Sequence, residues 1–250
     1  MRILVTFAVQ TEFAPWRKMR GFKRISTVPF ELYDAVVGTH TVRVLLTGIG
    51  WECAKRTANP AMNDVFDACI SSGLSGGLKA EYHAGDILAF RAVGELNGER
   101  AFSSSEWLVR QASAKGIKTA EKLITSNRLV VTAEEKHRIG SFGDAVDMES
   151  FRILAAAQGR GIPTLAVRAI SDTVDEDLPM DFSQHISENG QIAAGRVFGQ
   201  LFFSPQVIPA MVRFGSRTRQ VAEQLTDFLD SFVSTLVPQP LADSKEVATR

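Results

Sequence analysis

The 250-residue chain lacks the features that mark several specialised protein classes. It has no excess charge, because 28 Lys and Arg residues balance 28 Asp and Glu residues, whereas nucleic-acid binding depends on clustered basic residues. No apolar run approaches the roughly 18 residues of a membrane span. No Pro-, Ser- or Gly-rich linker divides the chain. These absences argue against a nucleic-acid partner and a membrane span, and they predict a single domain over residues 1–237 with a flexible tail at 238–250.

Cysteine and histidine are also scarce. Cys53 and Cys69 form neither a CxxC motif nor a disulfide framework, so we expect small core residues of a reducing compartment and a cytoplasmic protein. The histidines are scattered without metal-ligand spacing, which predicts no metal site; they are His40, His83, His137 and His185. Since GxSxG, Walker A and GxGxxG motifs are missing, a serine nucleophile, ATP and NAD are disfavoured, and we predict no cofactor.

Short apolar runs recur along the chain between glycine or polar turns, and they predict strands. They cover residues 3–9, 41–46, 68–71, 86–92, 129–131 and 164–170. Helical spacing appears between them at residues 51–67, 104–115 and 149–158. This alternation predicts an α/β layered fold with a mostly parallel sheet.

The C-terminal third is rich in apolar side chains. Residues 221–236 repeat them at spacings of three and four, which predicts an amphipathic helix that covers the sheet. Residues 197–214 carry large apolar side chains interrupted by two prolines. We expect core burial for this stretch, with a subunit contact or an apolar substrate channel as alternatives.

Three acidic residues stand where predicted strands end or helices begin: Glu12, Glu149 and Asp172. In an open α/β sheet, ligands collect outside the carboxyl ends of the strands. Each acid also has a local structural interpretation. Glu12 and Glu149 suit the first turn of a helix, and Asp172 suits a helix N-cap. The acids indicate a site only if the fold brings them together.

Several segments in the same order carry a family resemblance. They are residues 1–13 (MRILVTFAVQTEF), 47–50 (TGIG), 73–78 (GLSGGL), 85–87 (GDI), 146–150 (VDMES) and 168–172 (RAISD). Over roughly residues 1–195 the chain resembles the nucleoside phosphorylase and nucleosidase superfamily, and within it the methylthioadenosine/S-adenosylhomocysteine nucleosidases. The resemblance implies a three-layer α/β/α fold with a central mixed, mostly parallel sheet, a small-molecule nucleoside substrate and a homodimer.

The resemblance also implies a role for each acid. Glu12 matches the residue that activates the attacking water, Glu149 with Met148 matches the pair that holds the ribose, and Asp172 matches the acid that protonates N7 of the purine. These residue types suit the reaction, because a purine leaves readily only when protonated and water needs a base. The remaining implied substrate-binding residues are Gly73, Leu74, Ser75, Val130 and Val131.

The chain departs from the family pattern in three places. Leu74 stands where the family has a serine near the sugar, and Val130 stands where a phenylalanine stacks on adenine. The segment from there to Glu149 is also shorter. Beyond residue 195 the chain resembles the longer, hopanoid-associated nucleosidases, which release adenine from an adenosyl lipid. The sequence therefore does not determine the 5′ substituent or the shape of the base pocket.

Charge favours water over phosphate as the nucleophile. The turn at residues 71–75 contains no arginine, and Glu12 would repel an anion there. We expect hydrolysis of a 5′-substituted adenosine. A phosphate-dependent purine nucleoside phosphorylase is the alternative, since basic residues elsewhere offer an anion site; they are Arg17, Lys18, Lys55 and Arg56. A non-catalytic nucleoside-binding subunit is a third hypothesis, disfavoured because binding alone needs no water-activating acid.

Overall fold

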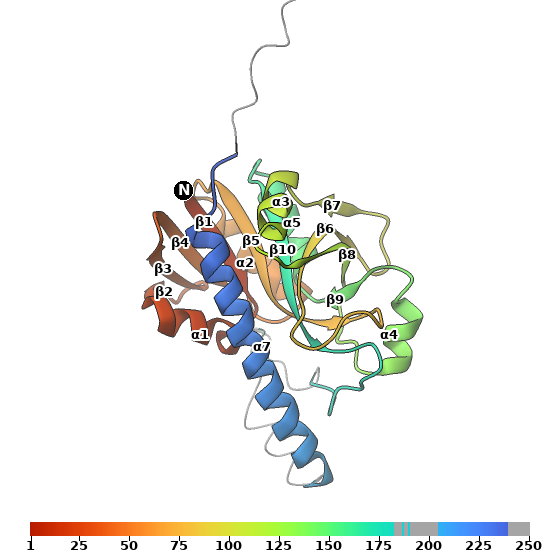
Figure 1. The fold of residues 1–250 in the computed structure, drawn as a ribbon. Helices are drawn as coiled ribbons and strands as arrows, with labels where there is room; N and C mark the ends of the chain where they lie inside the picture. Colours follow the sequence, from red (N-terminus) through yellow and green to blue (C-terminus); the bar gives the residue numbers. More distant parts are fainter. Residues whose placement is uncertain (183–186, 188–189, 191–204, 240–250) are drawn as a thin grey trace, which may run out of the picture.

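The computed structural model describes residues 1–182, 187, 190 and 205–239, and its strands form one mixed sheet (Figure 1). The strands are β1 (Arg2–Phe7), β2 (Lys23–Ser26), β3 (Glu31–Val37), β4 (His40–Leu46), β5 (Ala68–Gly77), β6 (Ile87–Glu95), β7 (Ala101–Ser103), β8 (Lys118–Thr125), β9 (Ala145–Asp147) and β10 (Thr164–Asp172). The α-helices are α1 (Gln10–Arg20), α2 (Trp51–Ala61), α3 (Glu106–Ser113), α4 (Ala133–Ile139), α5 (Ser150–Gln158) and α7 (Ile208–Ser234), and a short 3-10 helix η2 (Pro205–Val207) precedes α7.

The sheet closes on itself at one end and is open at the other. Its strand order is β10-β6-β8-β9-β5-β1-β4-β3-β2, and an additional pairing of β10 with β5 joins five strands into a ring. Five pairings in the described part of the chain are parallel and five are antiparallel. The mixed α/β sheet is therefore confirmed, but it has as many antiparallel as parallel pairings and is not mostly parallel as expected, because β3, β6, β7 and β9 each have an antiparallel neighbour. Because β1, β5 and β10 run parallel side by side, their carboxyl ends meet at one edge.

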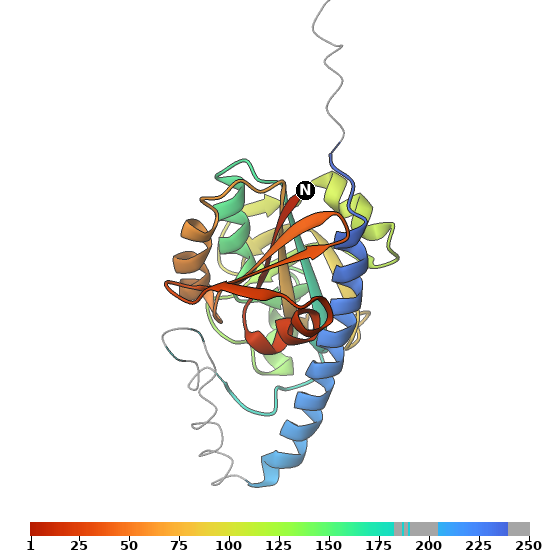
Figure 2. The ribbon, with the colours of Figure 1, turned by 90° about the vertical axis from the view of Figure 1, so that its left-hand side faces the viewer.

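Helices cover both faces of the sheet. Alternate residues of a strand point to opposite faces: Ile3 and Val5 of β1 join a core cluster with α1 and α7, whereas Leu4 joins a second cluster with α2 and α5. Figure 2 shows α7 and α2 on opposite sides of the sheet. The three-layer arrangement implied by the family resemblance is confirmed.

One predicted strand is wrong. Residues 129–131 lie in the loop between β8 and α4, where Ser126 Oγ donates to the Arg128 carbonyl at 2.7 Å and the Arg128 N–H donates back to Ser126 Oγ at 3.2 Å. These local bonds hold a turn in place of an extended chain. The strand precedes it as β8, which the apolar pattern does not reveal because charged residues interrupt it. The predicted helix at 51–67 also ends early, at Ala61, one residue after Pro60.

The long helix α7 is buried over only its second half. Leu225 and Leu229 are fully buried, as the amphipathic pattern predicts, whereas the first half projects beyond the sheet in both views (Figures 1 and 2). Val212 is 65% exposed, so this part of the apolar stretch at 197–214 is not core. Residues 197–204, and residues 240–250 of the predicted tail, lie outside the described residues.

No helix in the described part of the chain is long and apolar enough to cross a membrane. Over the same residues, no group of three or more His, Cys, Asp or Glu side chains is arranged to hold a metal ion. Both cysteines are buried and neither forms a disulfide, as expected.

Candidate active site

Glu12 lies at the junction of β1 and α1. Its carboxylate accepts hydrogen bonds from the N–H of Ala8 at 3.0 Å and the N–H of Leu74 at 3.0 Å, so it bridges the ends of β1 and β5. Burial raises the pKa of Glu12, while the N–H donors and the Arg168 charge partly oppose the rise. A carboxylate with a raised pKa is a stronger base. Glu12 occupies the first turn of α1 as well, so its local structural role and its place in the site coexist.

Gly73 allows Glu12 to approach β5 closely. Its φ is +145°, and an added Cβ would lie 3.2 Å from both Glu12 carboxylate oxygens and 3.3 Å from Nη1 of Arg168. A Cβ contact at 3.2 Å is tighter than nine in ten observed contacts. The glycine is required here by this close approach within a strand, and not by the tight turn that the sequence suggests.

Arg168 is a site residue that the sequence reasoning missed. It is 2% exposed, and its Nη2 donates to Asp147 Oδ2 at 2.7 Å and to Ser150 Oγ at 2.7 Å. Its Nη1 faces Gly73 and Glu12. The available signal was a basic residue in the middle of strand β10, with apolar residues at 165–167 and 169–170 on either side of it. Arg168 thus brings one positive charge to the acids.

Glu149 lies beside the start of α2. Its Oε1 accepts a hydrogen bond from the Gly50 N–H at 2.6 Å, and the methyl carbon of Met148 lies 3.8 Å from where a Cβ of Gly50 would be. Burial, followed by the charge of Asp147, raises the pKa of Glu149 to about 8, and the charge of Glu12 adds to the rise. Glu12 and Glu149 therefore share one electrostatic environment.

Asp172 ends β10 opposite Gly76 of β5. It is 5% exposed, and its Oδ2 lies 3.1 Å from where a Cβ of Gly76 would be. Ser171 Oγ donates to Oδ1 at 2.6 Å, and Lys136 Nζ donates to Oδ2 at 2.5 Å. Neither donor was singled out from the sequence, and no local pattern marks Lys136.

The fold brings two of the three acids to one strand and the third close to one of them. Glu12 meets β5 at Gly73 and Asp172 meets it at Gly76, and three residues of a strand span about 10 Å. Glu149 joins the Glu12 end through their mutual charge effect. The site therefore has two carboxyl groups at one end and a third at the other.

The other predicted substrate-binding residues are placed as follows. Leu74 contributes its backbone N–H to Glu12, and its side chain packs on the core. Ser75 has a buried Oγ with no hydrogen-bond partner in the described part of the chain, and its carbonyl oxygen lies 3.2 Å from Ser171 Oγ. Val130 is buried in a small cluster with Val146, on the Asp172 side. No described contact brings Val131 to the acids; its carbonyl accepts from the Leu178 N–H.

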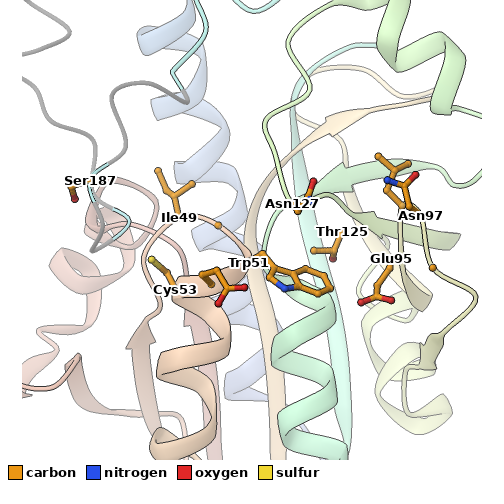
Figure 3. Close-up of a pocket in the computed structure, with 12 residues that line it drawn as sticks. Ile49, Trp51, Cys53, Glu95, Asn97, Thr125, Asn127 and Ser187 are labelled. Atoms are coloured by element: carbon orange, nitrogen blue, oxygen red, sulfur yellow. The ribbon is translucent and has the colours of Figure 1, made fainter.

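A cavity of about 650 Å³ lies next to these residues (Figure 3). Gly50 forms part of its wall and also binds Glu149, so the cavity and the acids are adjacent. Trp51 lies between the two sides of the cavity and stacks on Phe151 with ring centroids 5.5 Å apart. None of the described residues that line it is Lys or Arg. The wall combines apolar and polar side chains, among them Ile49, Leu96, Glu52, Glu95, Asn97 and Asn127.

Comparisons with known proteins show the family of the chain and structures with a similar fold. Residues 2–199 match the family described as the phosphorylase superfamily. A similar solved structure is the 5′-methylthioadenosine/S-adenosyl homocysteine nucleosidase of Campylobacter jejuni, with TM-score 0.74, 16% identity, and 94% of this chain and 100% of that chain covered. Futalosine hydrolase of Helicobacter pylori gives TM-score 0.73 and 18% identity over 94% of this chain and 98% of that chain. The 5′-methylthioadenosine/S-adenosylhomocysteine nucleosidase of Neisseria meningitidis in complex with methylthio-immucillin-A gives TM-score 0.71 and 18% identity over 94% of this chain and 99% of that chain. At these low identities, the TM-scores show a shared fold.

Proposed function

The chain belongs to the phosphorylase superfamily, and from this premise we propose that it is a nucleosidase that hydrolyses the N-glycosidic bond of a 5′-substituted adenosine. The products are adenine and the ribosyl remainder. One observation carries the proposal: Glu12 lies beside Arg168 at Gly73 of β5, Glu149 is close enough to be affected by both charges, and Asp172 lies at Gly76 on the same strand. The similar structures include two methylthioadenosine/S-adenosylhomocysteine nucleosidases and a futalosine hydrolase, which supports hydrolysis.

Glu12 is the base for the attacking water. Because burial raises its pKa, the ionised carboxylate takes a proton more readily than an exposed glutamate does. The Cβ position of Gly73 lies 3.2 Å from both Glu12 oxygens and 3.3 Å from Arg168 Nη1, so the carboxylate and the guanidinium are neighbours. We assign the attacking water to a position beside this pair, where it donates a hydrogen bond to Glu12.

Glu149 holds the ribose hydroxyls and responds to charge on the sugar. A carboxyl whose pKa is about 8 is mostly protonated at pH 7 in the empty site. Cleavage of the C1′–N9 bond passes through an oxocarbenium-like sugar, and this nearby positive charge favours the carboxylate. The interaction therefore strengthens as the bond breaks, which is the condition for lowering the barrier.

Asp172 serves the departing base at the other end of the site. Breaking the C1′–N9 bond leaves the electron pair on the purine, and a proton at N7 turns it into neutral adenine. The separation of about 10 Å between the two points on β5 suits a purine nucleoside, with water at one end and N7 at the other. Val130 and Val146 provide apolar surface near Asp172 for the base.

The charges favour water over phosphate as the nucleophile. Arg168 is the one observation that favours a phosphorylase, since it brings a cation to Glu12. However, Arg168 donates to Asp147 through Nε at 3.1 Å and through Nη2 at 2.7 Å. The charge of Arg168 is therefore already balanced by Asp147. A phosphate dianion would then face Glu12, and two unit charges 4 Å apart repel by about 4 kcal/mol at an effective dielectric constant of 20.

The cavity beside Gly50 is the place we assign to the 5′ substituent. Its volume of about 650 Å³ falls in the range of small-molecule sites. Ile49, Trp51 and Leu96 offer apolar contact to a thioether or a longer chain. The absence of Lys and Arg among its described lining residues disfavours a 5′-phosphate. Methylthioadenosine, S-adenosylhomocysteine and an adenosyl lipid are the substrates that fit this description.

The test is an assay for free adenine with methylthioadenosine as substrate, run with and without inorganic phosphate. We expect equal release in both. If adenine release requires phosphate and the second product is 5-methylthioribose 1-phosphate, the protein is a phosphorylase. Binding of the nucleoside without release under either condition would assign a non-catalytic binding protein.

A further inference from the structure

Lys136 is a buried cation in contact with Asp172, and the reaction described above does not use it. The side chain, on α4, is 0% exposed. Its Nζ donates to Oδ2 of Asp172 at 2.5 Å, to the Thr173 carbonyl at 2.9 Å and to the Glu176 carbonyl at 2.7 Å. These three acceptors match the three N–H donors of an ammonium group. Lysine is almost never fully buried unless it is paired. The partner of Lys136 is the proposed acid, so this lysine is a candidate for a role in the reaction.

The contacts of Asp172 suit a carboxylate that has no proton of its own. Lys136 donates to one oxygen and Ser171 donates to the other at 2.6 Å. Both partners are donors and one is cationic, which stabilises the negative form. Yet protonation of N7 requires a proton at this position. The ammonium of Lys136 is the charged proton donor in contact with Asp172.

We propose that Lys136 supplies, through Asp172, the proton that the departing purine takes up. The inference rests on the proposed nucleosidase function. As the C1′–N9 bond breaks, its electron pair goes to the purine; a proton moves from Asp172 to N7, and a proton of the Lys136 ammonium moves to Asp172. The water oxygen bonds to C1′ and its proton goes to Glu12. Asp172 ends as a carboxylate and Lys136 as a neutral amine, and exchange with solvent moves the proton from Glu12 back to Lys136.

Lys136 also makes structural contacts, and a control variant has to separate them from the supply of a proton. The carbonyls of Thr173 and Glu176 belong to the turn after β10, so Lys136 also ties this turn to α4. The same turn is held independently, because Arg217 donates to Glu176 Oε1 at 2.7 Å. Arg217→Gln therefore loosens the turn while it leaves the contact between Lys136 and Asp172 intact. It is the matched control.

The experiment compares two substrates that share the methylthioribosyl group. Methylthioadenosine needs a proton on its leaving group, whereas 4-nitrophenyl 5-methylthio-β-ribofuranoside releases a stable anion without one. Lys136→Gln keeps N–H donors for the carbonyls but loses the charge. We expect it to lower kcat for methylthioadenosine at least about a hundredfold, with a small change in KM, and to keep nitrophenol release within about threefold of wild type. Arg217→Gln stays near wild type on both.

A double variant provides the second measurement. Lys136→Gln/Asp172→Asn removes both charges together, and it is expected to match Asp172→Asn alone on both substrates, because the two residues act in one proton path. It also carries the test if Lys136→Gln fails to fold. Equal losses on both substrates, or unchanged adenine release, would overturn the role of Lys136. A wild-type enzyme that cleaves neither substrate would instead overturn the proposed nucleosidase function, and the role of Lys136 with it.

Discussion

Replacing Gly73 by alanine should separate the chemistry of the site from the stability of the fold. The new Cβ would lie 3.2 Å from both Glu12 oxygens and 3.3 Å from Arg168 Nη1, so the methyl group presses on both side chains and displaces the Glu12 carboxylate. At φ +145° a side chain also strains the backbone by about 1–3 kcal/mol. A displaced base costs far more in rate, since a misplacement of about 1 Å loses on the order of a hundredfold. We expect Gly73→Ala to lower kcat/KM for methylthioadenosine by at least this factor.

The assay pairs adenine release with thermal melting. For a chain of this size, about 1 kcal/mol corresponds to roughly 2–4 °C in Tm, so Gly73→Ala should melt a few degrees below wild type. Gly161→Ala is the control, because Gly161 has a positive φ of +70° but no atom within 4 Å of an added Cβ. It should lose similar stability and keep full activity.

Two results would refute this reasoning. Wild-type kcat/KM in Gly73→Ala would mean that the placement of the Glu12 carboxylate against Gly73 does not matter to the reaction. An equal loss of activity in Gly161→Ala would mean that backbone strain alone, wherever it occurs, accounts for the effect.

The remaining predictions concern the acids, the 5′ side and the assembly. Glu12→Gln and Asp172→Asn should each lower turnover of methylthioadenosine at least about a hundredfold; wild-type turnover with a normal melt would remove that residue from the chemistry. Because the folded-state pKa of Glu149 is raised to about 8, the native state binds more protons than the unfolded chain between about pH 4.3 and 8. Stability from this group is therefore present at low pH and lost as pH rises through that window. Glu149→Gln should flatten the decline in melting experiments at several pH values, and an unchanged decline would contradict the shift. Adenosines with 5′-alkylthio groups should be cleaved at least about a hundredfold more efficiently than AMP, with a gain of up to about 0.8 kcal/mol per buried methylene; efficient cleavage of AMP would contradict the account of the cavity. Light scattering should find a homodimer, since exposed apolar residues such as Val212 (65% exposed) suit an obligate interface; a monomer at micromolar concentration would leave them without this explanation.

The acids could be predicted because their positions follow from chain order and strand direction. Glu12 and Asp172 lie at the ends of apolar strands, and parallel strands bring such ends to one edge of a sheet. Apolar periodicity likewise predicted the core strands β1, β4 and β10 and the buried half of α7. These are local signals, since burial of an element selects the residue types along it.

Strands with charged or short sequences gave no such signal. In β8, Glu121 and Lys122 face outward or partly outward, which breaks the apolar run, and the apolar letters at 129–131 belong to a loop closed by Ser126 and Arg128. The pairing of β10 with β5, which brings Asp172 beside Gly76, joins segments about a hundred residues apart.

Sequence alone therefore determined the layered α/β fold and the three acids at the ends of its elements, because hydrophobic periodicity and the residues that follow a strand are properties of the local sequence. The tertiary structure decided their partners. Arg168 resembles any charged interruption of a strand until Asp147 and Ser150 surround it, and Lys136, in a helix segment rich in charged residues, resembles a solvent-facing lysine until Asp172 is found against it. A buried charge is stable only where acceptors from other elements meet it, and those acceptors come from residues that are near in space but distant in the chain.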